Sequence, residues 1–176
     1  MSRRWPIPVL LASLSFGCKW IDEAAAKDTK IVVFSAGPAT SFTVDGGESV
    51  TLEDGKFSSF PVVPGDHEVA FDDGRRVSVK LEAFDRWVVP AVEDQCFFGI
   101  DVGSSHYTAD GKNALGGPDI ANRRRDSDPF KFPANHYLTQ KELPKQVSAG
   151  TLVYLLRSLP CADIDKLQAG LDGAGE

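Results

Sequence analysis

Cysteine, histidine and serine are the residue types in this chain that could supply a nucleophile, a base or a metal ligand. The three histidines, His67, His106 and His136, are far apart, and none belongs to an H-E-x-x-H pattern or another zinc-binding spacing. No G-x-S-x-G turn would present a serine, and no glycine-rich loop leads into a helix that could hold phosphate. We therefore predict no catalytic residue, no metal and no cofactor, and a binding role rather than an enzymatic one.

The length, composition and charge indicate one acidic globular domain rather than a nucleic-acid-binding protein. The chain has 176 residues, of which 42% are hydrophobic and 25% are charged, which is typical of a single globular domain. Its formal net charge of -6 argues against nucleic acid as a partner, because phosphate binding needs a basic face. The basic run at residues 123–125 is followed at once by Asp126 and Asp128, so its charge is locally balanced.

The first residues have the pattern of an export signal. Arg3 and Arg4 precede 13 residues without a charge, Trp5 to Gly17, which is the order of a signal peptide. A membrane span needs about 20 apolar residues, so this run is too short to be one. We predict that residues 1–17 are a signal peptide, and the alternative is a buried N-terminal helix.

The residues LSFGC, Leu14 to Cys18, resemble the lipobox of bacterial lipoproteins. Gly17 supplies the small residue that this family has directly before the cysteine, and Ser15 stands where leucine is usual. The resemblance implies that Cys18 receives a diacylglyceryl group on sulfur and palmitate-type acylation, and becomes the first residue after cleavage. Several acyl chains on one residue anchor a protein stably in a membrane. Since Lys19 follows the cysteine, the resemblance also implies the outer membrane.

The segment Ala24–Ala26 offers a second cleavage site, with the A-x-A pattern of the ordinary signal peptidase. Cleavage there would discard Cys18 and release a soluble secreted binding domain. The charged residues Lys19, Asp22 and Glu23 separate this site from the apolar run and disfavour it. Retention of the uncut segment is the third alternative.

The remaining cysteines, Cys96 and Cys161, form an even number once Cys18 carries lipid. In an oxidising compartment such a pair tends to close, so we predict a Cys96–Cys161 disulfide. The loop-entropy model gives about 4 kcal/mol of stabilisation for a loop of this length. No C-x-x-C motif is present, which argues against redox catalysis. The alternative is two unpaired cysteines that act as small buried hydrophobic residues.

Residues 31–102 have the pattern of short β-strands separated by turns. Apolar and polar residues alternate, as at Val77, Val79 and Leu81, and pairs such as Gly46-Gly47 and Asp54-Gly55 are hairpin signals. No helical period runs between them. We predict a mainly β fold, an antiparallel β-sandwich or partly open barrel, with a long loop region and a short C-terminal helix.

A further resemblance covers roughly residues 40–83. The segments VDGGESV (Val44–Val50), VPGDHEVAF (Val63–Phe71) and RRVSVKLEA (Arg75–Ala83) are similar to the PEGA-type sandwich modules of bacterial surface proteins. The resemblance implies a β-sandwich with a turn at Pro64-Gly65. Proline presets the first central torsion of such a turn and glycine accepts the second.

The rest of the chain divides into a short linker, a long loop and a C-terminal segment. We predict that residues 18–30 form a lipidated N-terminus and linker, and that residues 103–146 form a loop region, since they are rich in Gly, Pro, Asn and Asp. The aromatic residues of this loop argue against free disorder, so we expect it to pack over the sheet and to provide the binding surface. The candidate surface residues are His106, Tyr107, Arg124, Phe130, Phe132, His136 and Tyr137.

Residues 147–176 complete the same domain. Ser148–Leu159 could form a strand or a helix, because periodicity alone does not decide between them. The sequence after it predicts a helix that begins near Pro160 and places Ile164, Leu167 and Leu171 on one apolar stripe. Cys161 would join this helix to the strand of Cys96.

Together these patterns favour a lipid-anchored β-domain of the bacterial cell envelope that acts in binding or assembly. It would face the periplasm or the cell surface and would have a membrane and a protein, not nucleic acid, as partners. The alternative is an inhibitor or immunity lipoprotein. Its acidic body and the loop between Tyr107 and Tyr137 would then enter the basic cleft of a cell-wall-degrading enzyme.

Overall fold

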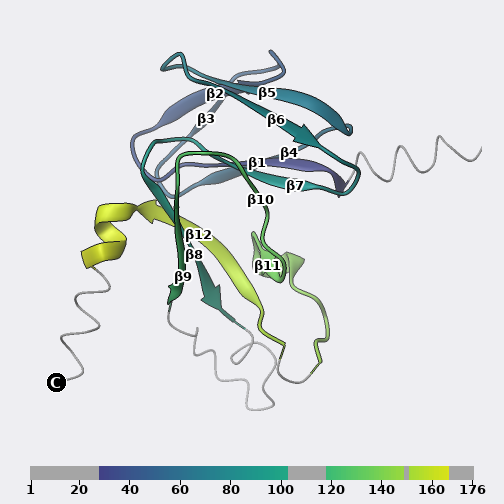
Figure 1. Ribbon diagram of the computed structural model, residues 1–176, viewed down its shortest axis with the longest axis vertical. Helices are drawn as coiled ribbons and strands as arrows, with labels where there is room; N and C mark the ends of the chain where they lie inside the picture. The colour runs from purple at the N-terminus through teal and green to yellow at the C-terminus, as the bar shows by residue number, and fades with distance from the viewer. Residues whose placement is uncertain (1–27, 103–117, 149–150, 167–176) are drawn as a thin grey trace, which may run out of the picture.

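Three open β-sheets, here called A, B and C, make up the protein in a computed structural model that describes residues 28–102, 118–148 and 151–166. In Figure 1, sheets B, A and C follow one another from top to bottom. The described strands do not close into a barrel, so the predicted mainly β fold is confirmed as a layered, sandwich-type arrangement. The expected signal peptide, Cys18, His106 and Tyr107 lie outside the described residues.

Sheets A and B form a two-layer sandwich from the first half of the chain. Sheet B contains β3 (Val50–Leu52), β2 (Thr40–Val44), β5 (Gly65–Phe71) and β6 (Arg76–Leu81), in that order. Sheet A contains β10 (Phe130–Lys131), β7 (Arg86–Pro90), β1 (Lys30–Phe34) and β4 (Phe57–Pro61). Their facing side chains form one apolar core in which Ile31, Phe42 and Val69 are almost completely buried.

Strand β1 is buried on both of its faces. Ile31 and Val33 point into the core shared with sheet B, whereas Val32 and Phe34 point into a second core shared with sheet C. The strand lies between β7, with which it pairs in parallel, and β4, with which it pairs antiparallel. This position explains why its sequence is a continuous apolar run instead of an alternating one.

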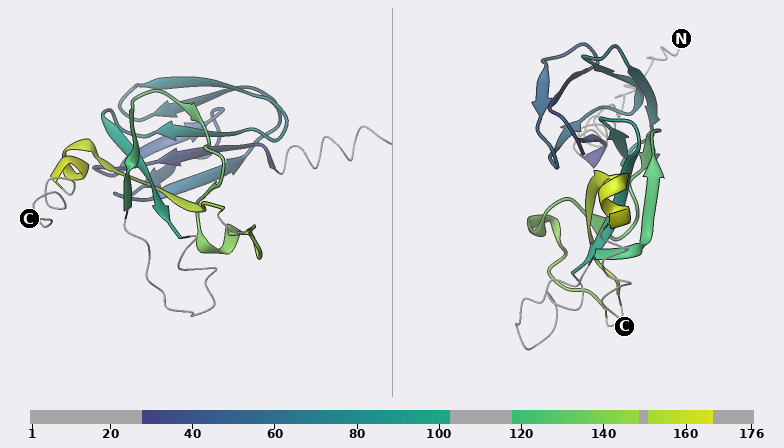
Figure 2. Two further views of the ribbon diagram at one scale, coloured as in Figure 1. Left: turned by 60° about the horizontal axis from the view of Figure 1, so that its bottom comes forward. Right: turned by 90° about the vertical axis from the view of Figure 1, so that its left-hand side faces the viewer.

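Sheet C is built from the second half of the chain. It contains β11 (His136–Tyr137), β12 (Tyr154–Pro160), β8 (Gln95–Asp101) and β9 (Pro118–Asp126), in that order. In the right-hand view of Figure 2, its strands extend away from the stacked sheets A and B. One face packs on sheet A through Phe97 and Leu156, and the opposite face packs on the helix over residues 161–166 through Phe98 and Ile164.

The predicted disulfide is present at the junction of sheet C and this helix. The sulfur atoms of Cys96 and Cys161 are bonded, their Cα atoms are 4.8 Å apart, and both residues are buried. The segment that could have been a strand or a helix is strand β12, which pairs with β8 along seven residues. Helix begins directly after Pro160, as predicted.

The expectation of a long loop over residues 103–146 is wrong for most of its described part. Strands β9, β10 and β11 and the 3-10 helix η1 (Gln140–Glu142) all lie within it. Strand β9 pairs antiparallel with β8, and β10 pairs antiparallel with β7. Strands β9 and β10 lie at the edges of their sheets, where backbone hydrogen bonds can hold a strand whose residues do not alternate between apolar and polar. The local sequence pattern therefore did not predict them.

Candidate binding groove

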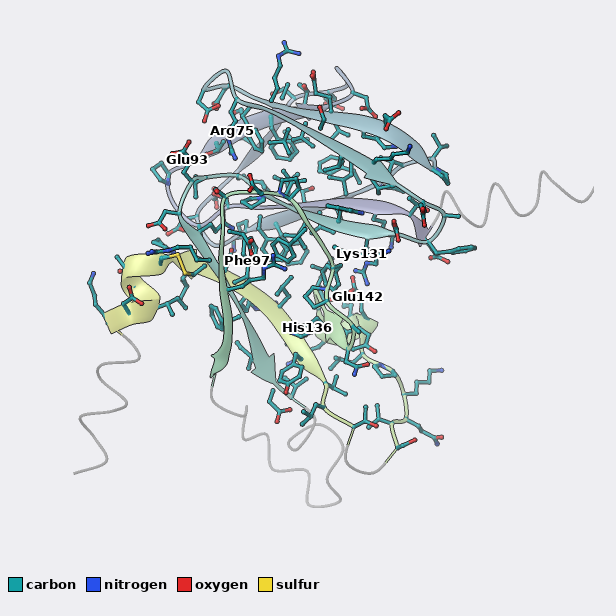
Figure 3. The ribbon with its side chains drawn as sticks, viewed as in Figure 1. Arg75, Glu93, Phe97, Lys131, His136 and Glu142 are labelled. Carbon is teal, nitrogen blue, oxygen red and sulfur yellow. A yellow bond between two sulfur atoms is a disulfide. The ribbon has the colours of Figure 1, made fainter. Side chains whose placement is uncertain are left out.

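An open groove of about 250 Å³ lies where β7, β10 and β11 meet. It is lined by Phe84, Arg86 and residues 131–137. Figure 3 places Lys131, Glu142 and His136 together on this side of the molecule, to the right of Phe97. Strand pairing builds the groove, because β10 brings Lys131 opposite Trp87 at the start of β7. This groove and its rim are the candidate binding site.

Arg86 forms one wall of the groove. Its guanidinium lies over the ring of Phe132 at 4.3 Å, and its Nη2 is 3.5 Å from Oε2 of Glu142. The Phe132 N–H donates to the carbonyl of Arg86 (2.7 Å), while Glu142 Oε2 accepts from the Leu138 N–H (3.0 Å). The ring of Phe132 holds the Arg86 side chain in place through the face of the guanidinium group, so N–H groups at its edge can still bind a ligand.

Lys131 and Asp85 form an ion pair at the end of the groove near Phe84. The distance between Lys131 Nζ and Asp85 Oδ1 is 2.5 Å, and the carboxylate is largely buried. The bond to Lys131 is the main reason why the pKa of Asp85 is lowered, and the same bond raises the pKa of Lys131. Both cations of the groove therefore have carboxylate partners, and the groove is close to electrically balanced.

His136 is fixed at the lower end of the groove. Its Nδ1 lies 2.9 Å from the Ala134 carbonyl, which can only accept, so Nδ1 carries a proton and donates to it. The ring stacks on Tyr154, with centroids 4.9 Å apart and planes 25° apart. The hydrogen bond and the stacking together fix the orientation of the imidazole ring.

Gly99 makes room for this stacked pair. A Cβ atom at Gly99 would lie 3.0 Å from His136 Nε2 and 3.0 Å from Tyr154 Cδ1, so the two rings would have to shift by a few tenths of an ångström to admit even alanine. The pairing of β8 with β9 is irregular between Phe97 and Gly99. A small hollow of about 30 Å³ beside it is lined in part by Arg124 and His136.

The structure brings together most of the predicted surface residues that it describes. Phe132, His136 and Tyr137 line the groove. Arg124 borders the small hollow, where it lies over the Phe130 ring at 4.0 Å and pairs with Asp126. Phe130 itself is only 5% exposed, so it belongs to the core between sheets A and C and supports the surface instead of offering a contact.

Sequence reasoning missed Phe84, Arg86 and Lys131. The first two lie in and after the turn that joins β6 to β7, outside the segment in which we looked for a site. Phe84 and Arg86 lie close to β10 only because β7 pairs with β10, more than forty residues further along the chain. No local sequence pattern predicts such a pairing. The signal available in the sequence is an aromatic residue, Phe84, between Ala83 and Asp85, where the alternation of Val77, Val79 and Leu81 ends.

His67 has a structural role in sheet B. Its Nδ1 is 2.7 Å from Asp45 Oδ2 and its Nε2 is 2.7 Å from the Val63 carbonyl, and the residue is 8% exposed. Burial opposes ionisation of Asp45, but hydrogen bonds from the Glu68 N–H and from His67 outweigh it and lower the pKa of Asp45. The two turns that carry the PEGA-type resemblance are thus joined through one histidine.

The groove offers stacked rings, two ion-paired cations and polar groups, which suit binding of a ligand or a protein. Among the described residues, no three His, Cys, Asp or Glu side chains gather as they would around a metal ion. Within the same part of the chain, no helix has the length and apolar character to cross a membrane. Comparison with protein-family models, curated proteins and solved structures gave no match.

Proposed function

We propose that this chain is a lipid-anchored β-domain of the bacterial cell envelope, held in the outer membrane through Cys18, that acts in binding or assembly. The observation that carries the proposal is the Cys96–Cys161 disulfide. It accounts for two of the three cysteines, which leaves Cys18, in its lipobox-like setting, without a cysteine partner in the same chain. A disulfide in a buried position also fits an exported protein.

The groove supports binding as the function of the exposed body. Arg86, Lys131 and His136 come from three different strands or turns, and hydrogen bonds, ion pairs or ring stacking hold each of them. Side chains that are fixed before a partner arrives lose little conformational freedom on binding. A protein partner that presents both polar and aromatic groups would match this lining.

Intact mass of the protein purified from bacterial membranes tests the anchor. We expect a chain that begins at Cys18, carries the mass of a diacylglyceryl group and an amide-linked acyl chain, and gains two hydrogens on reduction. A Cys18→Ala variant should lack the lipid mass and keep the gain on reduction. A chain that begins after Ala26 and carries no lipid would overturn the proposal in favour of a secreted domain.

Photo-crosslinking in cells tests the groove as the binding surface. A photoreactive residue at the exposed Asn135 should give a recurring crosslinked product, whereas the same residue at the exposed Asp73 should not. His136→Ala should reduce the product from Asn135, because it removes the ring that shapes the lower end of the groove. Equal products from Asn135 and Asp73 would show that the groove is not the partner surface.

An inhibitor of a cationic cell-wall-degrading enzyme is the second candidate, and an acidic end of the sandwich favours it. Three turns meet there, over residues 53–56, 72–75 and 91–94. Arg75 donates to the Pro90 and Ala91 carbonyls. The end of β1 joins the third turn, since the Phe34 carbonyl accepts the Ala91 N–H and the Ser35 N–H donates to the Lys56 carbonyl. The turns expose six carboxylates, on Glu53, Asp54, Asp72, Asp73, Glu93 and Asp94, of which Asp73 is paired with Arg75 and Asp94 with Arg125. Figure 3 shows Arg75 and Glu93 at this end, away from the groove.

Replacing Asp72 and Asp73 with lysine should abolish inhibition of such an enzyme, and unchanged inhibition would discard this candidate.

A further inference from the structure

The end of the sandwich opposite the acidic end exposes two large apolar side chains. We call it the Thr29 end, and it consists of Thr29 and the turns over residues 62–64 and 82–85. Val63 is 62% exposed and Phe84 is 57% exposed, and the third large hydrophobic side chain exposed in the described part of the chain, Leu152, lies outside this end. Single exposed apolar residues are common on protein surfaces, but these two flank the same buried residue.

Thr29 holds both turns in place. Its carbonyl accepts the Val62 N–H (3.0 Å), its hydroxyl accepts the Phe84 N–H (2.8 Å), and the residue is completely buried. His67 holds the Val63 carbonyl from the other side. The apolar tips are therefore presented on backbone that buried polar groups fix, rather than on free loops.

The turn itself does not explain a phenylalanine at position 84. Phe84 has a φ of 68°, a left-handed conformation that glycine or asparagine adopts with less strain than a bulky residue. Asp85 stabilises the turn, since its Oδ2 accepts the Glu82 N–H (3.1 Å). More than half of the Phe84 surface remains exposed, so its apolar ring contributes little to the fold. A contact between the Phe84 ring and another molecule would explain why a phenylalanine occupies this position.

The Thr29 end is the end of the sandwich next to the chain that leads back to Cys18. Asp28, the residue next to Thr29, is ten residues from Cys18, and a chain of that length spans at most about 35 Å. Strands β1 and β7 start at this end and lead to the acidic end, so the exposed carboxylates of the acidic end lie furthest from the tether. Lys131 and Arg86 are ion-paired with Asp85 and Glu142. Asp28, Lys30 and Glu82 also lie at this end, so the two apolar tips project from a surface that carries charges of both signs.

We propose that Val63 and Phe84 insert into the interface of the bilayer that carries the lipid on Cys18, as a second contact that sets the orientation of the body. The inference rests on the proposed lipid anchor. Apolar burial drives the contact, so it needs no anionic lipid and is insensitive to salt. It directs the acidic end away from the membrane and keeps the groove, whose rim includes Phe84, close to the lipid surface.

Fluorescence quenching of single tryptophan insertions in the acylated, full-length mature protein tests the orientation. All variants carry Trp20→Phe, so that Trp87 is the only other tryptophan in the mature chain and contributes equally to each. Phe84→Trp then reports on the Thr29 end, and Glu53→Trp reports on the acidic end. The proteins are reconstituted in phosphatidylcholine vesicles with or without brominated acyl chains. We expect brominated chains to quench Phe84→Trp about twofold more than Glu53→Trp, because an interfacial side chain reaches the acyl boundary. Val63→Trp, at the second tip, should behave like Phe84→Trp and provides the same readout should one substitution disturb folding.

The outcomes separate the anchor from the orientation. Acylated protein in which the three insertions are quenched equally would overturn the second contact and leave the lipid anchor standing. Protein that intact mass shows to lack acylation would overturn the anchor and, with it, the orientation. Phe84→Asn should melt at the same temperature as the parent protein or higher, because asparagine suits the left-handed conformation. A clearly lower melting temperature would mean that the phenylalanine serves the fold, and would overturn the inference.

Discussion

Sheets B and C both pack against sheet A, but they are built in different ways. Sheet B consists of two hairpins, β2–β3 and β5–β6, each with a short turn, and its core face is apolar while its other face is polar. Strand β4 of sheet A lies between the two hairpins in the chain, and the hairpins pair through β2 and β5. Sheet C joins β8 to β12 across more than fifty residues, and both of its faces are covered. Local turns can therefore organise the two hairpins of sheet B, whereas sheet C depends on the sheet A core and on the disulfide.

The largest expected effect comes from the shared core between sheets A and C. Phe34 is 1% exposed and packs against Phe57 and Phe97, with ring centroids 5.2 and 5.6 Å apart. Phe34→Ala should lower the free energy of unfolding by about 3–5 kcal/mol through the lost contacts and the remaining cavity. Amide hydrogen exchange should rise first in β8 and β12. The matched variant Phe42→Ala, in the core between sheets A and B, should instead raise exchange first in β2 and β5.

If both phenylalanine variants raise exchange in the same strands, the two halves unfold as one cooperative unit. Sheets B and C would then not differ in local stability, even though they are built in different ways.

The second effect is loss of the disulfide. A Cys96→Ala, Cys161→Ala double variant should be less stable by about 2–4 kcal/mol, since the unfolded chain regains the freedom that the long loop had lost. Chemical denaturation with and without reductant measures this difference, and reductant should have no effect on the double variant. Exchange in sheet B should change little under native conditions. An equal rise of exchange in sheet B would contradict the separate dependence of sheet C on the bridge.

A third, smaller effect is expected at Gly99, where sheet C makes room for two rings. Gly99→Ala would bring a methyl group to 3.0 Å from His136 and Tyr154 and should cost about 1–3 kcal/mol. Gly37→Ala is the matched control, because its new Cβ would lie 3.7 Å from Val92 at ordinary contact distance. Thermal melting compares the two variants. If both melt alike, the ring stack at Gly99 is easily displaced and the groove is less rigid than its contacts indicate.

The smallest effect is the response of sheet B and its neighbouring turn to acid. The folded-state pKa of Asp45 and of Asp85 is lowered, so each carboxylate contributes stability above the unfolded value of 3.8 and loses it as the pH falls through the lower folded value. Asp45→Asn, which suits the φ of 52° at this position, should flatten the acid limb of the stability curve by less than about 1 kcal/mol. Denaturation midpoints between about pH 5 and pH 2 measure it. An unchanged acid limb would show that the bonds which the Asp45 carboxylate accepts from the Glu68 N–H and from His67 do not contribute to the pH dependence of stability.

The sequence predicted the segment that contains much of the candidate site, but not which residues would line the groove. The aromatic residues between positions 130 and 137 marked the segment, and Phe132, His136 and Tyr137 do line the groove. Arg86 and Lys131 were not predictable, because their proximity results from the pairing of β10 with β7. Phe130 was misread as a surface residue, because a short edge strand carries no alternation from which its buried face can be recognised.

The sequence alone determined the β class, the turns of sheet B and the pairing of two cysteines, because alternation, glycine-containing turns and cysteine number are local or countable properties. The tertiary structure decided the parallel pairing of β1 with β7, the strand β9 in a charged segment, and the place of Phe84 beside Thr29. These features arise from hydrogen bonds and packing between residues far apart in the chain, and such contacts leave little trace in the local order of residue types.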